Sequence, residues 1–108
     1  MRIEPLVFAI VTSLFPFVVL AQQRGSIEEG LAYARAHCAE CHGVEPDQKD
    51  FSPNIAAPDF SVVANTPGMT ERAIRVWLQT SHPTMPNFMI PEDARDDLVS
   101  YIMSLKIS

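Results

Sequence analysis

The sequence predicts an all-α domain, and three features support this fold class. Apolar residues recur at helical spacing, no segment alternates with the period of a β-strand, and long proline-rich segments separate the candidate helices. The chain has 108 residues, of which 47% are hydrophobic and 19% charged, a globular composition for one domain at most. Its formal net charge of −5 argues against a non-specific nucleic-acid binder, which needs a surface of Lys and Arg.

Residues 1–21 have the pattern of an export signal. Leu6 to Ala21 is an uncharged, largely apolar stretch, shorter than the roughly 20 residues that a membrane-spanning helix needs. It ends in Val19-Leu20-Ala21, which suits a signal peptidase, and polar residues follow. We therefore expect cleavage after Ala21, a mature domain of residues 22–108 and a periplasmic location. The alternative is an uncleaved N-terminal anchor.

A first helix is expected from Ser26 to about His37. Ser26 followed by Glu29 is a capping-box pattern. One apolar face of this helix is formed by Ile27, Leu31 and Ala34. Gly30 lies beside this face and lowers helix stability by roughly 1 kcal/mol relative to Ala. We expect the close approach of another helix to compensate for that loss.

The central part of the chain is less regular. The stretch from Gly43 to Met69 has no sustained period and holds four prolines, so we expect a long loop that wraps around a bound group. A further helix is expected from Thr70 to about Leu78, with Thr70 or Gly68 near its N-cap. Another proline-bounded loop follows, from residue 80 to residue 91.

The last helix is the clearest element of the sequence. Pro91 suits a first helical turn, although Ile90 before it offers no side-chain cap. A single apolar stripe is formed by Ala94, Leu98, Tyr101, Ile102 and Leu105. Acidic residues crowd the N-terminal half of this helix and Lys106 follows its end, and both biases suit the helix dipole.

The two cysteines of the chain lie in one short motif. Residues 38–42 read Cys-Ala-Glu-Cys-His, which is the C-x-x-C-H pattern of c-type haem attachment. At the end of a helix, the thiols of Cys38 and Cys41 reach the two vinyl groups of one porphyrin, and His42 then presents a ring nitrogen to the iron. A mature domain this small usually needs such a cofactor or a covalent staple.

Three other interpretations of the motif were weighed. A thioredoxin-like redox pair needs a strand before the motif, where a helix is expected here. A zinc site needs further ligands, and beyond His42 and His82 the chain has no second cysteine pair to offer. A structural disulfide between Cys38 and Cys41 is the third alternative.

From about Ser26 to Leu105 the chain resembles a small class I c-type cytochrome, of the bacterial monohaem kind. Gly30, eight residues before the first haem cysteine, matches the first helix of that family. Leu98 and Tyr101 match the residues of the family's last helix that pack against this glycine. The resemblance implies a cytochrome c-like fold, with three to four short helices and long loops wrapped around one covalent haem.

Two further segments carry the resemblance. Residues 57–60 (Ala-Pro-Asp-Phe) resemble the segment whose proline carbonyl accepts a hydrogen bond from the proximal histidine. Residues 85–88 (Met-Pro-Asn-Phe) resemble the segment that supplies the distal methionine. The resemblance thus implies His42 as the proximal iron ligand, Pro58 as the acceptor for its other ring nitrogen, and Met85 as the distal iron ligand.

Alternatives to these assignments stay open at this point. Met89 and His82 are rivals of Met85 for the distal position, and Pro53 is a rival of Pro58 as the acceptor. A His/Met pair suits an electron carrier, because it keeps the iron six-coordinate and raises the potential relative to harder ligand sets.

Other residues are assigned to the pocket around the haem. Four apolar residues are expected to line it, namely Phe51, Ile55, Phe60 and Phe88. Trp77 is expected in the core, with an indole N–H contact to a haem propionate as the alternative. Arg72 and Arg75 face either a propionate or solvent, and Met69 and Met103 are interpreted as packing residues.

The sequence therefore predicts a periplasmic electron carrier with one covalent haem c. It would dock transiently with a redox-protein donor and acceptor, remain a monomer, bind no nucleic acid and have no catalytic residues. The alternative is a haem-based sensor or enzyme with an open distal site, which requires that Met85 does not bind iron. A thiol protein without haem is a third class.

The intact mass of the exported protein tests the leader and the motif together. In a host that attaches haem, we expect the mass of residues 22–108 plus one haem group. A mass that still includes residues 1–21 would indicate a retained anchor. A mass without the haem group would leave Cys38 and Cys41 as free or paired thiols.

Overall fold

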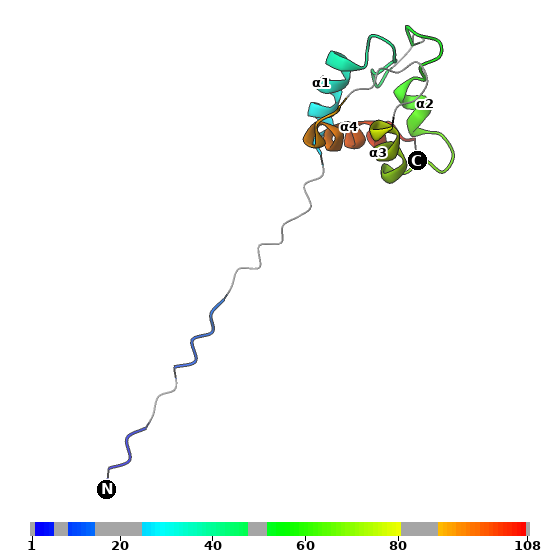
Figure 1. The fold of residues 1–108 in the computed structure, drawn as a ribbon. Coiled ribbons are helices and arrows are strands. Elements are labelled where there is room, and N and C mark those ends of the chain that lie inside the picture. The colour runs from blue at the N-terminus through cyan, green and yellow to red at the C-terminus, as the bar shows by residue number, and fades with distance from the viewer. Residues whose placement is uncertain (1, 6–8, 15–24, 48–51, 81–88, 108) are drawn as a thin grey trace.

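The computed structural model describes residues 2–5, 9–14, 25–47, 52–80 and 89–107. Within these ranges the chain forms four helices and no strand, which confirms the all-α prediction. The helices are α1 (Ile27–His37), α2 (Phe60–Ala64), α3 (Glu71–Gln79) and α4 (Glu92–Ser104). The described parts of the leader lie away from the helical domain, as Figure 1 shows. Among the described residues, no helix is both long and apolar enough to span a membrane.

The predicted starts of α1 and α3 agree with the structure. The side chain of Ser26 accepts a hydrogen bond from the N–H of Glu29, and the side chain of Thr70 accepts one from the N–H of Ala73. Thr70, and not Gly68, is therefore the N-cap of α3. The absence of a side-chain cap on α4 was expected, but Pro91 is the N-cap of this helix and not part of its first turn, because its backbone is extended and the helix begins at Glu92.

One helix was missed by the sequence analysis. The stretch from residue 43 to residue 69 was expected to be a loop, but it contains α2. This helix has five residues, too few to give a recognisable helical period. Its N-cap residue, Asp59, makes no side-chain hydrogen bond to the helix.

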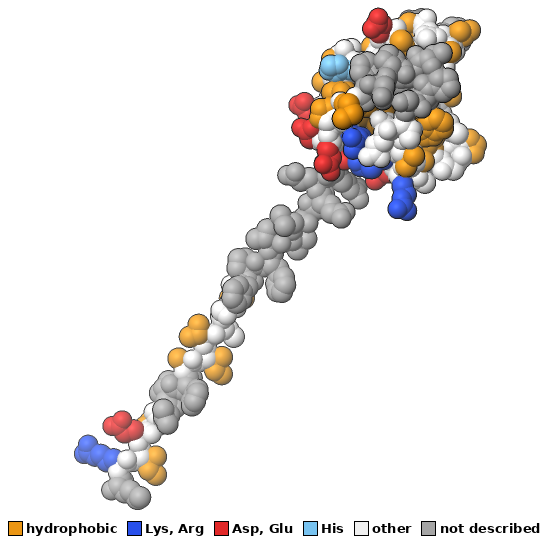
Figure 2. All heavy atoms as spheres, viewed as in Figure 1, with side chains coloured by type: hydrophobic (Ala, Val, Ile, Leu, Met, Phe, Trp, Pro, Cys, Tyr) orange, Lys and Arg blue, Asp and Glu red, His pale blue; other side chains and the backbone are white. Residues whose placement is uncertain are grey.

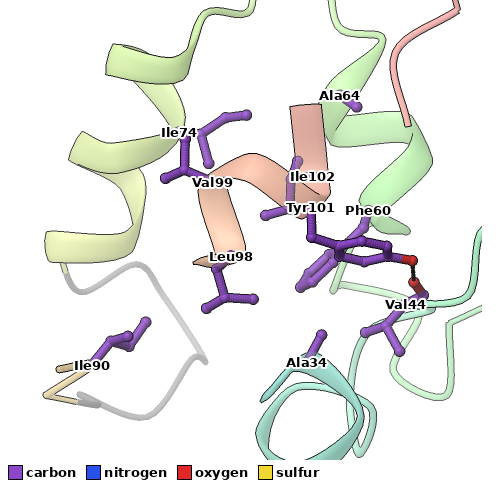
Figure 3. Close-up of a cluster of buried hydrophobic side chains, with 10 residues drawn as sticks. All are labelled: Ala34, Val44, Phe60, Ala64, Ile74, Ile90, Leu98, Val99, Tyr101 and Ile102. Carbon is purple, nitrogen blue, oxygen red and sulfur yellow. Dashed lines mark hydrogen bonds between the residues drawn. The ribbon is translucent and has the colours of Figure 1, made fainter. Parts of the chain in front are cut away.

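The four helices are organised around α4. Among the described residues, α1, α2 and α3 each pack on α4, and none of these three packs on another. The buried core contains residues of all four helices and of the segments between them, gathered around α4 in Figure 3. Its members are Ala34, Val44, Phe60, Ala64, Ile74, Ile90, Leu98, Val99, Tyr101 and Ile102.

The crossing of α1 and α4 is very close. A Cβ atom at Gly30 would overlap the backbone carbonyl of Asp97 and lie 2.7 Å from the Cβ of Tyr101. A Cβ at Gly25 would overlap the backbone of Asp96 in the same way. The expected close approach of a second helix at Gly30 is therefore present, and its partner is α4.

The N-terminal ends of these two helices lie side by side. The N–H of Ser26 donates to a carboxylate oxygen of Asp97 at 2.7 Å. The first turns of the two helices also carry acidic residues, namely Glu28, Glu29, Glu92 and Asp93. Figure 2 shows acidic side chains close to the place where the leader joins the domain. Negative charge is favourable at a helix N-terminus, so each helix stabilises the acidic residues of its own first turn.

Gly30→Ala tests the close crossing. We expect this variant to lower the free energy of unfolding of the haem-loaded protein by about 3 kcal/mol or more, at the upper end of overpacking effects. The reason is that a backbone carbonyl cannot rotate out of the way, and the gain in helix propensity of about 1 kcal/mol does not offset that. Denaturant titration measures the difference.

Ala36→Leu is the matched control, because it enlarges an exposed side chain on the same helix. We expect it to stay within about 0.5 kcal/mol of the wild type. Equal stability of Gly30→Ala and the wild type would show that the two helices do not cross this closely.

Candidate functional site

The motif residues leave the end of α1 in one compact turn. Cys38 is the C-cap of α1, and its N–H donates to the carbonyl of Ala34 at 2.8 Å. The N–H of His42 then donates to the carbonyl of Cys38 at 2.9 Å. Cys38, Cys41 and His42 all line the same cavity. The helix end thus presents two thiols and one imidazole to a single space.

That space is a cavity of about 560 Å³, within the range of about 300–1,000 Å³ found for small-molecule and cofactor sites. Its walls come from all four helices and from the segment before α2. Apolar side chains on the wall include Phe60, Val62, Val63, Met69, Ile74, Trp77, Leu78, Ile90 and Ile102. The three motif residues therefore meet a predominantly apolar chamber, which suits the flat apolar body of a porphyrin.

His42 is oriented by a backbone carbonyl. Its Nδ1 lies 2.7 Å from the carbonyl oxygen of Pro58. Because a carbonyl oxygen only accepts, Nδ1 carries the proton and donates it, which leaves Nε2 unprotonated and able to bind a metal. The predicted acceptor is thus Pro58 and not Pro53. The ring of Phe60 lies against the imidazole, with a centroid separation of 5.2 Å.

The segment from residue 52 to residue 60 is bound to the motif by several further hydrogen bonds. The N–H of Asn54 donates to the carbonyl of Cys41 at 3.1 Å, and the N–H of Phe60 donates to the carbonyl of Gly43 at 2.9 Å. In return, the N–H of Gly43 donates to the hydroxyl oxygen of Ser52 at 2.9 Å. The sequence analysis assigned no role to Ser52, since nothing local indicates that it meets a residue nine positions away.

The environment of Cys38 disfavours thiol redox chemistry. Burial raises the pKa of the Cys38 thiol to about 11. The thiolate is the reactive form in disulfide exchange, and redox-active cysteines have a lowered pKa instead. The segment before the motif is a helix, not the strand that a thioredoxin-like pair would require. Both observations favour haem attachment over a dithiol redox centre.

Phe60 and Trp77 both lie on the cavity wall. Phe60 is buried there, as expected. Trp77 also lines the cavity, but 55% of its surface is exposed, so its assignment to the core was wrong. α3 meets α4 through the face that carries Ile74, and Trp77 lies three residues further on, towards the cavity and the solvent. A residue at the mouth of a cavity is not distinguished from a core residue by spacing alone.

Ile55 does not have its predicted position. It is 99% exposed and does not line the cavity. The physical reason is a turn in which the N–H of Ala57 donates to the carbonyl of Asn54, and Ile55 lies at its tip. Met89, the rival distal ligand, is 94% exposed and is likewise not on the wall.

Other predicted residues fall elsewhere. Arg75 forms an ion pair with Asp96, which joins α3 to α4, and Arg72 is exposed. Four residues assigned from the sequence lie outside the described ranges, namely Phe51, His82, Met85 and Phe88.

Several wall residues were not identified from the sequence. Tyr33 and His37 line the cavity from α1, with their rings in contact at a centroid distance of 4.4 Å and tilted by 36°. Their spacing of four residues, ending next to Cys38, places them on the face of the helix that leads to the motif, and this signal was available. Met69, interpreted as a packing residue, also contributes to the wall.

The comparisons with known proteins agree with this geometry. A family model described as "Cytochrome c" matches residues 27–106. Searches of the curated proteins and of the solved structures each gave no significant match. The matched region begins with α1 and extends just beyond α4, so it includes all of the described residues that line the cavity.

Tyr101→Phe tests how the segment after His42 is held. The hydroxyl of Tyr101 donates to the carbonyl of Val44, a buried residue (Figure 3). Without the hydroxyl that carbonyl loses its donor, so we expect a loss of about 1–3 kcal/mol in unfolding free energy, measured by denaturant titration of the haem-loaded protein. Tyr33→Phe is the control, because the Tyr33 hydroxyl has no hydrogen bond within the described residues. Equal losses in both variants would contradict the prediction.

Proposed function

The chain belongs to the cytochrome c family, and from that membership we propose that it is a periplasmic electron carrier with His42 and Met85 as axial haem ligands. Haem c is covalently bound in this family, and Cys38 and Cys41 have the spacing of its attachment motif. The observation that carries the proposal is the hydrogen bond from His42 to the Pro58 carbonyl, on the wall of the cavity that both cysteines line.

The residues around the cavity fit a haem group. The two thiols and the imidazole line the chamber together, and the remaining walls are mostly apolar. Cys38 and Cys41 would hold the group through thioethers to its two vinyl groups, each the product of net addition of S–H across one C=C bond, so that no oxidant or reductant would be needed.

The haem, when bound, supplies an iron that gains and loses one electron. The residues of the chain bind the group, orient it and exclude water from it. Cys38 and Cys41 fix the position of the group, and His42 offers Nε2 to the iron. Pro58 keeps the imidazole in one orientation and increases its basicity. The apolar walls keep water away, so little needs to rearrange when the charge on the iron changes.

Met85 is proposed as the second axial ligand. It lies between Pro83 and Pro86, which makes that part of the sequence stiff, and it precedes the last helix. The exposure of Met89 and its absence from the cavity wall argue against the nearest rival. Met69 does reach the wall, but its backbone carbonyl and side chain are engaged with the core and with Lys106.

The location and the partners are part of the same proposal. The uncharged stretch of residues 6–21 supports export, in agreement with the typical location of cytochrome c domains. We propose a monomer that exchanges single electrons with a donor and an acceptor protein, without transforming a substrate. Because the net charge is −5, a uniformly acidic partner would be repelled.

Met85→Ala tests the distal ligand. We expect haem to stay attached, the ferric Fe–S(Met) charge-transfer band to disappear, and the ferrous protein to bind carbon monoxide. The reduction potential should fall by on the order of 100 mV or more, within the roughly 0.8 V over which axial ligands set haem potentials. Visible spectra and a redox titration measure these changes.

Met89→Ala is the matched control and should resemble the wild type in all three respects. If the spectra change in Met89→Ala and not in Met85→Ala, the ligand assignment is reversed. If the wild-type ferrous protein itself binds carbon monoxide readily, the distal site is open, and a sensor or an enzyme becomes the better description.

A further inference from the structure

We propose that Ser52 and Asp59 act as a pair of positioning residues, which hold the Pro58 carbonyl on His42 and thereby set the reduction potential of the haem. The inference rests on the proposed function, because it takes His42 as an iron ligand. It adds two residues, neither of which touches the cavity wall, to the machinery of electron transfer.

The pair closes a ring of contacts around the proximal histidine. The N–H of Gly43 donates to the hydroxyl oxygen of Ser52 at 2.9 Å, and that hydroxyl donates to the carboxylate of Asp59. Asp59 follows Pro58 in the chain, and the carbonyl of Pro58 accepts from the His42 ring at 2.7 Å. Since His42 precedes Gly43, three hydrogen bonds and two peptide links form a closed circuit.

Each hydrogen bond of the ring has a fixed donor and acceptor, and the hydroxyl of Ser52 takes both roles. The N–H of Gly43 only donates, so its partner has to accept. The same hydroxyl then has its own hydrogen left to donate to Asp59. A hydroxyl is one of the few groups that serve both neighbours at once, and hydrogen bonds to a carboxylate are stronger than those between neutral groups.

The Asp59 side chain does not make the hydrogen bond to a backbone N–H that is usual at its position. It is the N-cap residue of α2, where an Asp side chain normally accepts from a backbone N–H and stabilises the helix by about 1 kcal/mol. Here the carboxylate makes no such bond and accepts from Ser52 instead. α2 therefore begins without a side-chain cap, and the half-buried carboxylate fixes the chain at the residue next to Pro58.

The effect on the haem follows from the hydrogen bond to His42. A carbonyl held close to Nδ1–H makes the imidazole more basic and strengthens its donation to the iron. Stronger donation stabilises the ferric state more than the ferrous state, which lowers the reduction potential. When the ring is opened, the Pro58 carbonyl gains freedom, the bond to His42 weakens, and the potential rises.

Ser52→Ala opens the ring without changing any charge. In the haem-loaded protein we expect a higher reduction potential than in the wild type. We also expect the His42 Nδ1 proton, followed by NMR in the ferrous state, to exchange with solvent about tenfold faster, the factor that corresponds to one lost hydrogen bond of ordinary strength. Ser52→Thr keeps the hydroxyl and should restore both values.

Ser104→Ala is the matched control. The Ser104 hydroxyl also makes a partly buried hydrogen bond, but it donates to the carbonyl of Tyr101 within α4. We expect it to change neither the potential nor the exchange rate. If Ser52→Ala does not accumulate as folded protein, Asp59→Asn gives the second test, because it keeps a weaker acceptor of the same size. It should accelerate exchange of the His42 Nδ1 proton to a smaller extent.

Two results would overturn the positioning role. One is a Ser52→Ala protein with the potential and exchange rate of the wild type. The other is an Asp59→Asn protein whose potential rises while the His42 proton stays protected, since the carboxylate charge alone would then act. Failure of the proposed function is recognised separately, because the wild type would then show no haem c spectrum or no histidine signal from an iron ligand. In that case the inference falls with the function.

Discussion

The close contact between α1 and α4 is the constraint on which the rest of the structure depends. Gly30 allows the two backbones to touch, and within the described residues α4 is the only helix on which the others pack. α1, α2 and α3 are therefore held at fixed places around α4 without meeting one another. The cavity is the space that this arrangement leaves between them, with walls from all four helices. A bulkier residue at the crossing would displace the helix end that carries both cysteines.

A domain built in this way depends on its cofactor for part of its stability. Val62 and Trp77 lie on the cavity wall and remain more than half exposed in the protein chain itself. A group bound in the cavity covers such side chains and stabilises the fold by the free energy of its binding. Attachment and folding are thus linked, and the thioethers of Cys38 and Cys41 make that stabilisation permanent.

The features that could be predicted from the sequence are those with local causes. The capping of α1 and α3, the stripe of α4 and the C-x-x-C-H motif all depend on residues within a few positions of one another. The Pro58 acceptor was found through a family resemblance, and Gly30 through its cost in a helix. What was missed is either too short to leave a pattern or depends on how the chain turns and packs. α2 is too short to show a period, Ile55 was assigned to the pocket although a turn exposes it, and the Ser52–Asp59 pair exists only once the loop has closed on the motif.

The segment after the motif is held from three sides, and this has a consequence for electron transfer. Tyr101 of α4 binds the carbonyl of Val44, and Ser52 accepts from Gly43. On the outside, Arg35 of α1 makes two hydrogen bonds to Glu45, at 2.6 and 2.7 Å, and holds the pKa of that carboxyl below its usual value. A surface ion pair of this kind adds little stability, but it holds the segment after His42 in place against α1. Because His42 is anchored through its neighbours as well as through its ring, it has little freedom to shift, and an electron carrier needs that rigidity in the residue proposed here as its iron ligand.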